Sequence, residues 1–324
     1  MRTVTCDLCP RHCRLKEGER GDCRVRANID GKLYSLVYGK ACAAHVDPIE
    51  KKPVFHVLPG SSSFSIATAG CNLHCLYCQN WQISQRPPEE TPNIDLPPAS
   101  VVENARRYDC RSIAYTYTDP IVFYEYTLDT SRLAKDQGLL NILVTAGYIE
   151  QEPLKALCPF ITAANVDLKG MSDDFYRRMS QGTLTPVLEA ILTMKRMGVH
   201  VEITNLLVPT WNDTDKDILA LIRWIKEHCG SDTPLHFSRF WPTHELQNLP
   251  PTPEETLTHA WELARAEGLS FVYAGNMPGH PGNNTFCPGC GKILIRRRGY
   301  QILSSNLAEG TCDACGSRIP GIWK

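Results

Sequence analysis

The chain has 324 residues, with 34 Lys and Arg against 35 Asp and Glu and a formal net charge of −1. It is long enough to bury its own core as one large domain with small appendages. The balanced charge argues against binding to nucleic acid or an anionic membrane. No apolar run approaches the ~20 residues of a membrane span, and the N-terminus does not resemble a signal peptide, so we expect a cytoplasmic protein.

Fifteen cysteines fall mostly into short groups, which indicate metal ligands rather than disulfides in a reducing compartment. The first group is Cys6, Cys9, Cys13 and Cys23, set among glycines and charges with little apolar content. A segment of this composition needs a metal to fold stably. Tetrahedral zinc and an auxiliary iron–sulfur cluster both fit the spacing, and the turn-rich loop before the last ligand favours zinc.

The next segment, residues 32–56, alternates apolar and polar residues, which predicts a hairpin around residues 33–39. Residues 47–53 form a charged, proline-containing stretch that we expect to be a solvated loop, with an approach of its lysines and His56 to the active site as the alternative.

The second cysteine group, Cys71, Cys75 and Cys78, follows a short apolar strand at residues 64–68. Soft thiolates select zinc, copper(I) or iron–sulfur clusters. A structural zinc site or an ordinary four-iron cluster takes four protein ligands, so three suggest a cluster with one iron open to a reacting ligand. A fragment of a zinc site, or cysteines that only fill a loop, are the alternatives.

Strands and helices then alternate. Three helices are expected to end at Gly138, Gly198 and Gly268, each with a cationic residue in its last turn and a strand soon after. A capping box of Ser100 and Glu103, and the threonines Thr185, Thr214 and Thr252, mark expected helix starts. Strands are expected at residues 112–117, 140–144, 160–167, 199–207, 234–237 and 269–273. This order predicts a parallel sheet covered by helices, either doubly wound or a barrel.

The last cysteine group, Cys287, Cys290, Cys312 and Cys315, forms two C-x-x-C-G knuckles around a strand-rich insert. This pattern predicts a zinc ribbon, with an auxiliary cluster as the alternative. The basic run at residues 296–298 is expected to be a solvated strand edge.

The motif of Cys71, Cys75 and Cys78, with the aromatic Tyr77 before its last cysteine, resembles the signature of the radical S-adenosylmethionine (SAM) superfamily. The resemblance implies an α/β fold, a partial or full (β/α) barrel at residues 57–280. The cysteine-rich segments at residues 1–56 and 281–324 would flank it. The resemblance also implies a [4Fe-4S] cluster whose open iron binds SAM. One electron from the cluster would cleave SAM to a 5′-deoxyadenosyl radical, which would abstract hydrogen from a substrate.

Barrel chemistry lies at the carboxyl ends of the strands, so polar residues there are site candidates. Thr118 and Asp119 would bind the SAM ammonium, and Asp167 and Lys169 the ribose hydroxyls and methionine carboxylate. Asn205 would lie against adenine. The candidates for substrate contact are His236, Arg239 and Asn276.

Further segments narrow the resemblance: the N-terminal cysteine run, residues 116–120, 236–240 and 273–276, and the terminal ribbon. Together they look like the AmmeMemoRadiSam group, which is similar to pyruvate formate-lyase activating enzymes. That likeness implies MEMO-like and AMMECR1-like partners and an electron donor such as flavodoxin or ferredoxin. The substrate would be a small molecule or a protein, with activation of a glycyl-radical enzyme as one alternative. A zinc-dependent scaffold or binding protein is the alternative of another class.

Overall fold

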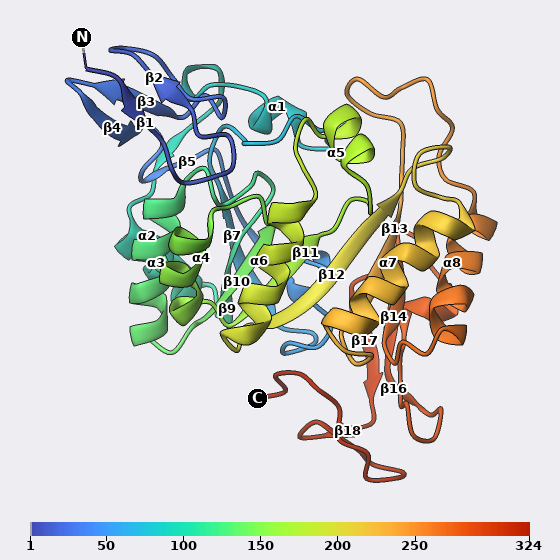
Figure 1. The fold of residues 1–324 in the computed structure, drawn as a ribbon. Helices are drawn as coiled ribbons and strands as arrows, with labels where there is room; N and C mark the ends of the chain where they lie inside the picture. The colour runs from blue at the N-terminus through green and yellow to red at the C-terminus, as the bar shows by residue number, and fades with distance from the viewer. Residues whose placement is uncertain (1) are drawn as a thin grey trace.

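The computed structural model describes residues 2–324, which are organised around one eight-stranded sheet (Figure 1). All neighbouring strands from β7 to β14 run parallel, and β6 adds an antiparallel edge. Within residues 2–324 the two edge strands, β6 and β14, do not pair, so the expected α/β barrel is confirmed in its partial, open form. In spatial order the strands are β6 (Ala43–Pro48), β7 (Ser62–Ala67), β9 (Ser112–Tyr115), β10 (Leu140–Thr145), β11 (Ala163–Asp167), β12 (His200–Leu207), β13 (Leu235–Arg239) and β14 (Val272–Gly275).

Helices cover the outer face of this sheet and bury most of the core against it (Figure 1). The three predicted glycine ends are confirmed, because Gly138, Gly198 and Gly268 all have left-handed φ angles just past a helix. The covering helices are α2 (Pro98–Arg107), α3 (Tyr124–Asp136), α4 (Gln151–Leu157), α6 (Thr185–Arg196), α7 (Asp215–His228) and α8 (Glu254–Ala266). Two short helices, α1 (Trp81–Ser84) and α5 (Asp173–Met179), lie instead at the carboxyl ends of the strands (Figure 1).

Only one of the predicted helix caps is correct. Thr214 accepts a hydrogen bond from the Asp217 amide at the start of α7. The helices α2 and α8 begin one residue after Pro97 and Pro253, and Thr185 is the first residue of α6 rather than its cap. Thr252 instead donates its hydroxyl to the Leu207 carbonyl at 2.6 Å. In α2 and α6 a proline stands in the first turn, where its fixed φ suits a helix and its missing amide leaves one donor fewer to satisfy, and neither helix has a side-chain cap.

The inner face of the sheet faces away from the helices. It is filled by side chains near the amino ends of the strands and open near their carboxyl ends. Near the amino ends of the strands, Val54, Val57 and Leu58 pack against Ala114 and Ile142. Near the carboxyl ends, inner-face residues on five strands are partly exposed, namely Val144, Asp167, Leu206, Ser238 and Gly275. The sheet therefore has a closed floor and a solvent-accessible mouth.

The N-terminal cysteine-rich segment lies at the mouth (Figure 1). Its hairpin joins β3 (Arg26–Ile29) to β4 (Lys32–Ser35) and turns at Asp30 and Gly31, which both have positive φ. It therefore precedes the hairpin expected around residues 33–39. The main sheet also begins with β6, before the boundary expected at residue 56. The remaining short pairs are β1 (Val4–Thr5) with β2 (Arg14–Leu15), and β5 (Lys40–Ala41) with β8 (Ile94–Asp95).

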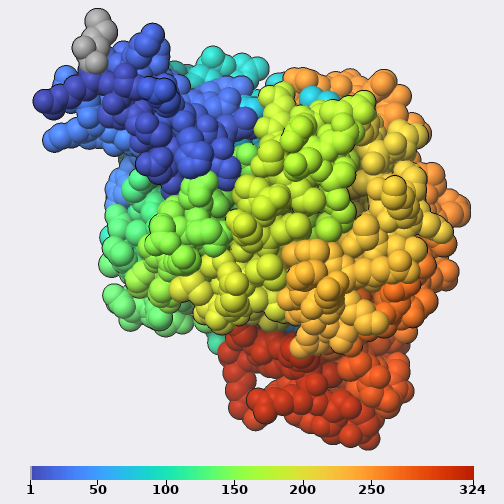
Figure 2. Space-filling view, in the orientation of Figure 1, coloured from blue at the N-terminus to red at the C-terminus, as the bar shows by residue number. Residues whose placement is uncertain are grey.

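The C-terminal segment lies at the opposite end, beneath the floor (Figures 1 and 2). Its strands are β15 (Thr285–Phe286), β16 (Ile293–Arg298), β17 (Gln301–Ser305), β18 (Leu307–Ala308) and β19 (Thr311–Cys312). Within β16, Arg296 and Arg298 are exposed as expected, but Arg297 is buried, so the expectation of a wholly solvated basic run was wrong. None of the helices formed by residues 2–324 has the length and apolar character needed to span a membrane.

Candidate active site

The loop that carries Cys71, Cys75 and Cys78 leaves β7 at the mouth of the sheet. Two backbone hydrogen bonds tie it to the end of α5: His74 N donates to Ser180 O and Leu76 N to Met179 O, both at 3.0 Å. Tyr77 is buried, and its hydroxyl lies 3.3 Å from that of Ser180. These contacts hold the three thiols on a preformed loop.

These three thiols are not gathered as tightly as the ligands of a single ion. Among residues 2–324, a set of three or more ligand atoms that all lie within 4.8 Å of one another occurs only at the C-terminal cysteines. A cubane holds its thiolates on different irons and so spreads them farther apart than one zinc ion does. Burial raises the pKa of the Cys71 and Cys78 thiols, so metal binding has to displace their protons.

Asp167 and Lys169 lie together at the end of β11, beside the loop. The Lys169 ammonium is 3.1 Å from the Asp167 carboxylate, and the Lys169 amide donates to the Tyr176 hydroxyl. Burial alone would lower the pKa of Lys169, but the negative charges of Asp167 and Cys75 raise it well above its usual value. The structure thus places a positive charge and a partly exposed carboxylate near the cysteine loop.

Thr118 and Asp119 are buried, and their side chains are hydrogen-bonded to other residues of the chain. Thr118 donates its hydroxyl to Thr68 O at 2.9 Å. Asp119 accepts from Ile121 N at 3.1 Å, from the Thr145 hydroxyl at 2.9 Å and from Ala146 N at 2.9 Å. Burial raises the pKa of Asp119, and these donors partly oppose that rise. The geometry gives both residues a role in joining strand ends, and their contact with SAM stays a prediction.

The other strand-end candidates differ in how far their side chains are already hydrogen-bonded within the chain. Asn205 donates to Leu168 O at 2.7 Å, and Arg239 donates to Thr252 O at 2.6 Å and to the Glu254 carboxylate at 3.0 Å. Asn276 is exposed at the mouth. Asn205 is therefore buried away from a ligand, Arg239 is partly exposed, and Asn276 is the most exposed of the three.

His236 lies at the floor rather than at the mouth. It is the second residue of β13, its Nε2 is 2.6 Å from Glu202, and its ring stacks on Tyr273 with a centroid separation of 4.8 Å. Glu202 is fully buried and also accepts from the His56 amide at 2.8 Å. The prediction that His236 ends a strand beside the substrate was wrong, because β13 continues to Arg239.

One buried network inside the sheet joins Lys52 to Asp47 and Tyr117, a pairing that was not predicted from the sequence. The Lys52 ammonium, 1% exposed, lies 2.6 Å from Asp47 and 4.4 Å from the centroid of the Tyr117 ring, and the Tyr117 hydroxyl donates to the same carboxylate. Burial lowers the pKa of Lys52 to about 8, although Asp47 acts to raise it. The expectation of a solvated loop at residues 47–53 was therefore wrong for Lys52, whose partner Tyr117 is remote in sequence and has a left-handed φ of 66°.

The four C-terminal thiols form a compact group at the far end of the molecule. Cys287 and Cys315 sulfurs are 3.5 Å apart, and those of Cys290 and Cys312 are 3.8 Å apart. Four thiolates around one zinc ion at about 2.3 Å would be separated by about 3.8 Å. The group therefore has the size of a site for a single tetrahedral ion.

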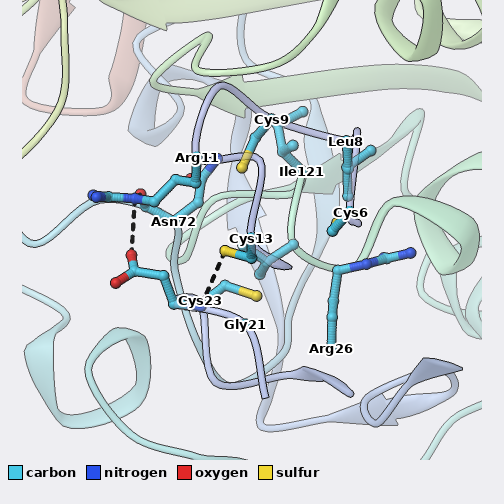
Figure 3. Close-up of a pocket in the computed structure, with 12 residues that line it drawn as sticks. Cys6, Leu8, Cys9, Arg11, Cys13, Gly21, Cys23, Arg26, Asn72 and Ile121 are labelled. Atoms are coloured by element: carbon cyan, nitrogen blue, oxygen red, sulfur yellow. Dashed lines mark hydrogen bonds and ion pairs between the residues drawn. The ribbon is translucent and has the colours of Figure 1, made fainter. Parts of the chain in front are cut away.

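The N-terminal thiols line a single pocket near the cluster loop (Figure 3). It is lined by Cys6, Cys9, Cys13 and Cys23 together with Arg11, Arg26 and Asn72.

Comparisons with known proteins identify the family of the chain. A family model described as the radical SAM superfamily matches residues 65–225. An uncharacterized protein of Methanocaldococcus jannaschii is 50% identical over 318 residues, which are 98% of this chain and 95% of that protein. The pyruvate formate-lyase-activating enzyme of Clostridium pasteurianum is 24% identical over 166 residues, which are 48% of this chain and 66% of that enzyme.

A solved structure, that of a radical SAM methyltransferase from Sphaerobacter thermophilus, shares the fold with a TM-score of 0.54, 18% identity and 68% coverage of each chain. The family model spans the strands that carry the cysteine loop and the residues around it. We conclude that this chain is an enzyme that belongs to the radical SAM superfamily.

Proposed function

We propose that Cys71, Cys75 and Cys78 hold a [4Fe-4S] cluster and that the enzyme cleaves SAM there to start hydrogen abstraction from a substrate. The observation that supports this most directly is the preformed loop, which presents three thiols at the open end of a parallel sheet. When bound, the cluster supplies the electron and SAM supplies the radical precursor.

The chain's own residues would bind and orient SAM. Lys169 carries a positive charge beside Cys75 and is suited to the methionine carboxylate of SAM. Asp167 forms an ion pair with Lys169 and is partly exposed. Its carboxylate is suited to an ammonium or to ribose hydroxyls. The partly exposed inner face between β10 and β14 would then receive the substrate, with Ser238 and Asn276 at its rim.

The substrate is a small molecule or a protein. Similarity to an enzyme that activates pyruvate formate-lyase supports the second possibility, in which a glycine of a partner protein loses hydrogen. MEMO-like and AMMECR1-like proteins are proposed partners on resemblance alone, and flavodoxin or ferredoxin is the proposed class of electron donor.

We also propose that Cys287, Cys290, Cys312 and Cys315 hold a structural zinc ion, because their sulfurs have the separation that one tetrahedral zinc requires. A zinc-dependent scaffold of another functional class would contain this metal without iron.

The test is deoxyadenosine formation by anaerobically reconstituted, reduced protein supplied with SAM. We expect product in the unaltered protein and none in Cys71→Ala, whereas Cys229→Ala, at a buried thiol outside the three groups, should keep turnover. Product formation that survives Cys71→Ala would overturn the proposal. Zinc alone in protein purified without oxygen, with no product, would support the scaffold. A persistent glycyl radical in mixtures with a partner protein would identify an activase.

A further inference from the structure

The N-terminal pocket has the composition of a cluster site. Cys6 and Cys23 are buried, and a Cβ placed on Gly21 would lie 3.7 Å from the sulfurs of both Cys13 and Cys23. The backbone therefore approaches the two sulfurs closely, and the Asp22 amide donates to the Cys13 sulfur at 3.5 Å. Figure 3 shows the sulfurs of Cys9, Cys13 and Cys23 around this pocket, with Cys6 at its other side.

The size of the site separates it from the C-terminal zinc group. The four sulfurs of the C-terminal group all lie within 4.8 Å of one another, and no three of the N-terminal cysteines meet that condition among residues 2–324. In this respect the N-terminal set matches Cys71, Cys75 and Cys78. Each thiolate of a cubane binds its own iron, so cubane ligands lie farther apart than the ligands of one zinc ion, and thiols that are not gathered within 4.8 Å favour the cluster.

A buried cation gives a second, independent indication. Arg26 is 7% exposed and lines the pocket, and its Nε has no hydrogen-bond partner anywhere in residues 2–324. Its terminal nitrogens are paired with Glu125 at 2.5 and 2.8 Å. An unpaired buried donor is costly, and a positive side chain that lines the pocket would stabilise an anionic cluster bound there.

The pocket adjoins the loop that carries the catalytic cysteines. Asn72, the residue after Cys71, lines the pocket, and its carbonyl accepts from Arg11 Nε at 2.8 Å. A Cβ on Gly70, the residue before Cys71, would lie 2.4 Å from the Cys23 carbonyl oxygen. The two cysteine sets are thus in contact through the residues on both sides of Cys71.

We propose that Cys6, Cys9, Cys13 and Cys23 hold an auxiliary [4Fe-4S] cluster that passes electrons to the cluster on Cys71, Cys75 and Cys78 through the contact at Asn72. The proposal rests on the proposed function for its second half, the electron transfer. A reduced protein donor of the flavodoxin or ferredoxin class gives one electron to the auxiliary cluster. That electron then moves to the catalytic cluster, so that the first is reoxidised as the second is reduced.

Metal analysis tests the site itself. Anaerobically purified protein should contain about eight irons and one zinc per chain, four irons belonging to each cluster. Cys9→Ser and Cys13→Ser should each lose about half of the iron and keep the zinc, and Cys71→Ala should lose the other half. Cys315→Ser, the matched control in the ribbon, should lose zinc and keep the iron. About four irons with two zincs per chain would overturn the assignment.

Reduction by two routes tests the relay. In Cys9→Ser, deoxyadenosine formation driven by reduced flavodoxin should fall at least tenfold, while formation driven by dithionite, a small reductant, should stay within about twofold of the unaltered protein. Equal losses by both routes would overturn the relay. Electron paramagnetic resonance keeps this test separate from the proposed function. Two cluster signals without any product would retain the auxiliary site and reject SAM cleavage.

Circular dichroism identifies a variant that has simply unfolded, and Asp22→Asn is the second variant if Cys9→Ser does so. Asp22 bridges Arg11 and His74 at 2.8 and 2.7 Å without belonging to either cysteine set. Loosening this bridge should slow the flavodoxin-driven reaction and leave the iron content at about eight per chain. An unchanged ratio of flavodoxin-driven to dithionite-driven rates in Asp22→Asn would count against the relay.

Discussion

The Arg297 guanidinium lies 3.8 Å from the Glu50 carboxylate, and neither side chain is exposed to solvent. Arg297 comes from β16 of the C-terminal segment, whereas Glu50 follows β6 at the edge of the main sheet. Arg297 also donates to the Phe55 carbonyl at 3.0 Å and to the Thr285 hydroxyl at 2.8 Å. One buried cation therefore joins the ribbon to the floor of the sheet.

Removing that cation should destabilise the protein strongly. Arg297→Ala leaves Glu50 buried without its counter-charge, and breaking a buried pair in this way costs about 3–5 kcal/mol of unfolding free energy. Thermal unfolding measures the loss. Arg296→Ala is the matched control on the same strand, since Arg296 is exposed, and it should change the midpoint little. Similar midpoints for the two variants would contradict the buried pair.

His56 should make stability depend on pH. Burial lowers its pKa from 6.5 to about 4, while Tyr273 and the Pro320 carbonyl occupy its ring nitrogens. Between these two values the unfolded chain binds a proton that the folded chain does not, so stability falls as the pH drops from 6.5 towards 4. The full loss is about 3 kcal/mol.

The change that isolates this effect is His56→Asn. Its unfolding midpoint should fall less between pH 7 and pH 5 than that of the unaltered protein. His228→Asn, at an exposed histidine, should keep the original dependence. Parallel pH curves for His56→Asn and the unaltered protein would show that another group controls the loss.

Gly70 should tolerate no side chain. Its φ is 86°, and a Cβ would lie 2.4 Å from the Cys23 carbonyl, so Gly70→Ala should displace the N-terminal segment from the cluster loop. Limited proteolysis of residues 2–30 should become faster, and dithionite-driven product formation should drop by at least tenfold. Gly138→Ala is the control, because its φ is also positive, at 73°, but its surroundings are open. Equal behaviour of the two variants would reject the close approach.

Lys169 should act on SAM binding rather than on folding. Lys169→Met removes the charge beside Cys75, and the loss of a charge-assisted hydrogen bond of about 1.5–3 kcal/mol corresponds to a rise in KM for SAM of about tenfold or more. Asp174→Asn, at an exposed carboxylate on nearby α5, should leave KM unchanged. An unaltered KM in Lys169→Met would remove Lys169 from the SAM site.

The sequence alone predicted most of the features that depend on local pattern. The strand before Cys71, the glycine helix ends and the parallel alternation all follow from neighbouring residues, and the structure has them. The pairing of Lys52 with Tyr117, or of Arg297 with Glu50, joins residues that are remote in sequence, so no local pattern could signal it. His236 was misplaced for a related reason: strand length is set by the neighbouring strands, and β13 runs on to Arg239 beside β12.

The floor of the sheet also constrains the order in which the protein can be completed during synthesis. The Leu58 amide donates to the Ile322 carbonyl at 2.7 Å, and His56 contacts the Pro320 carbonyl. Leu58 and His56 can therefore make these hydrogen bonds only after residues 320–322 have been synthesised. Until Ile322 has left the ribosome, the buried His56 and Leu58 lack these partners. Contacts this distant in sequence slow folding and leave apolar surface exposed meanwhile. A nascent chain stalled before residue 320 should therefore bind chaperones that the finished enzyme does not.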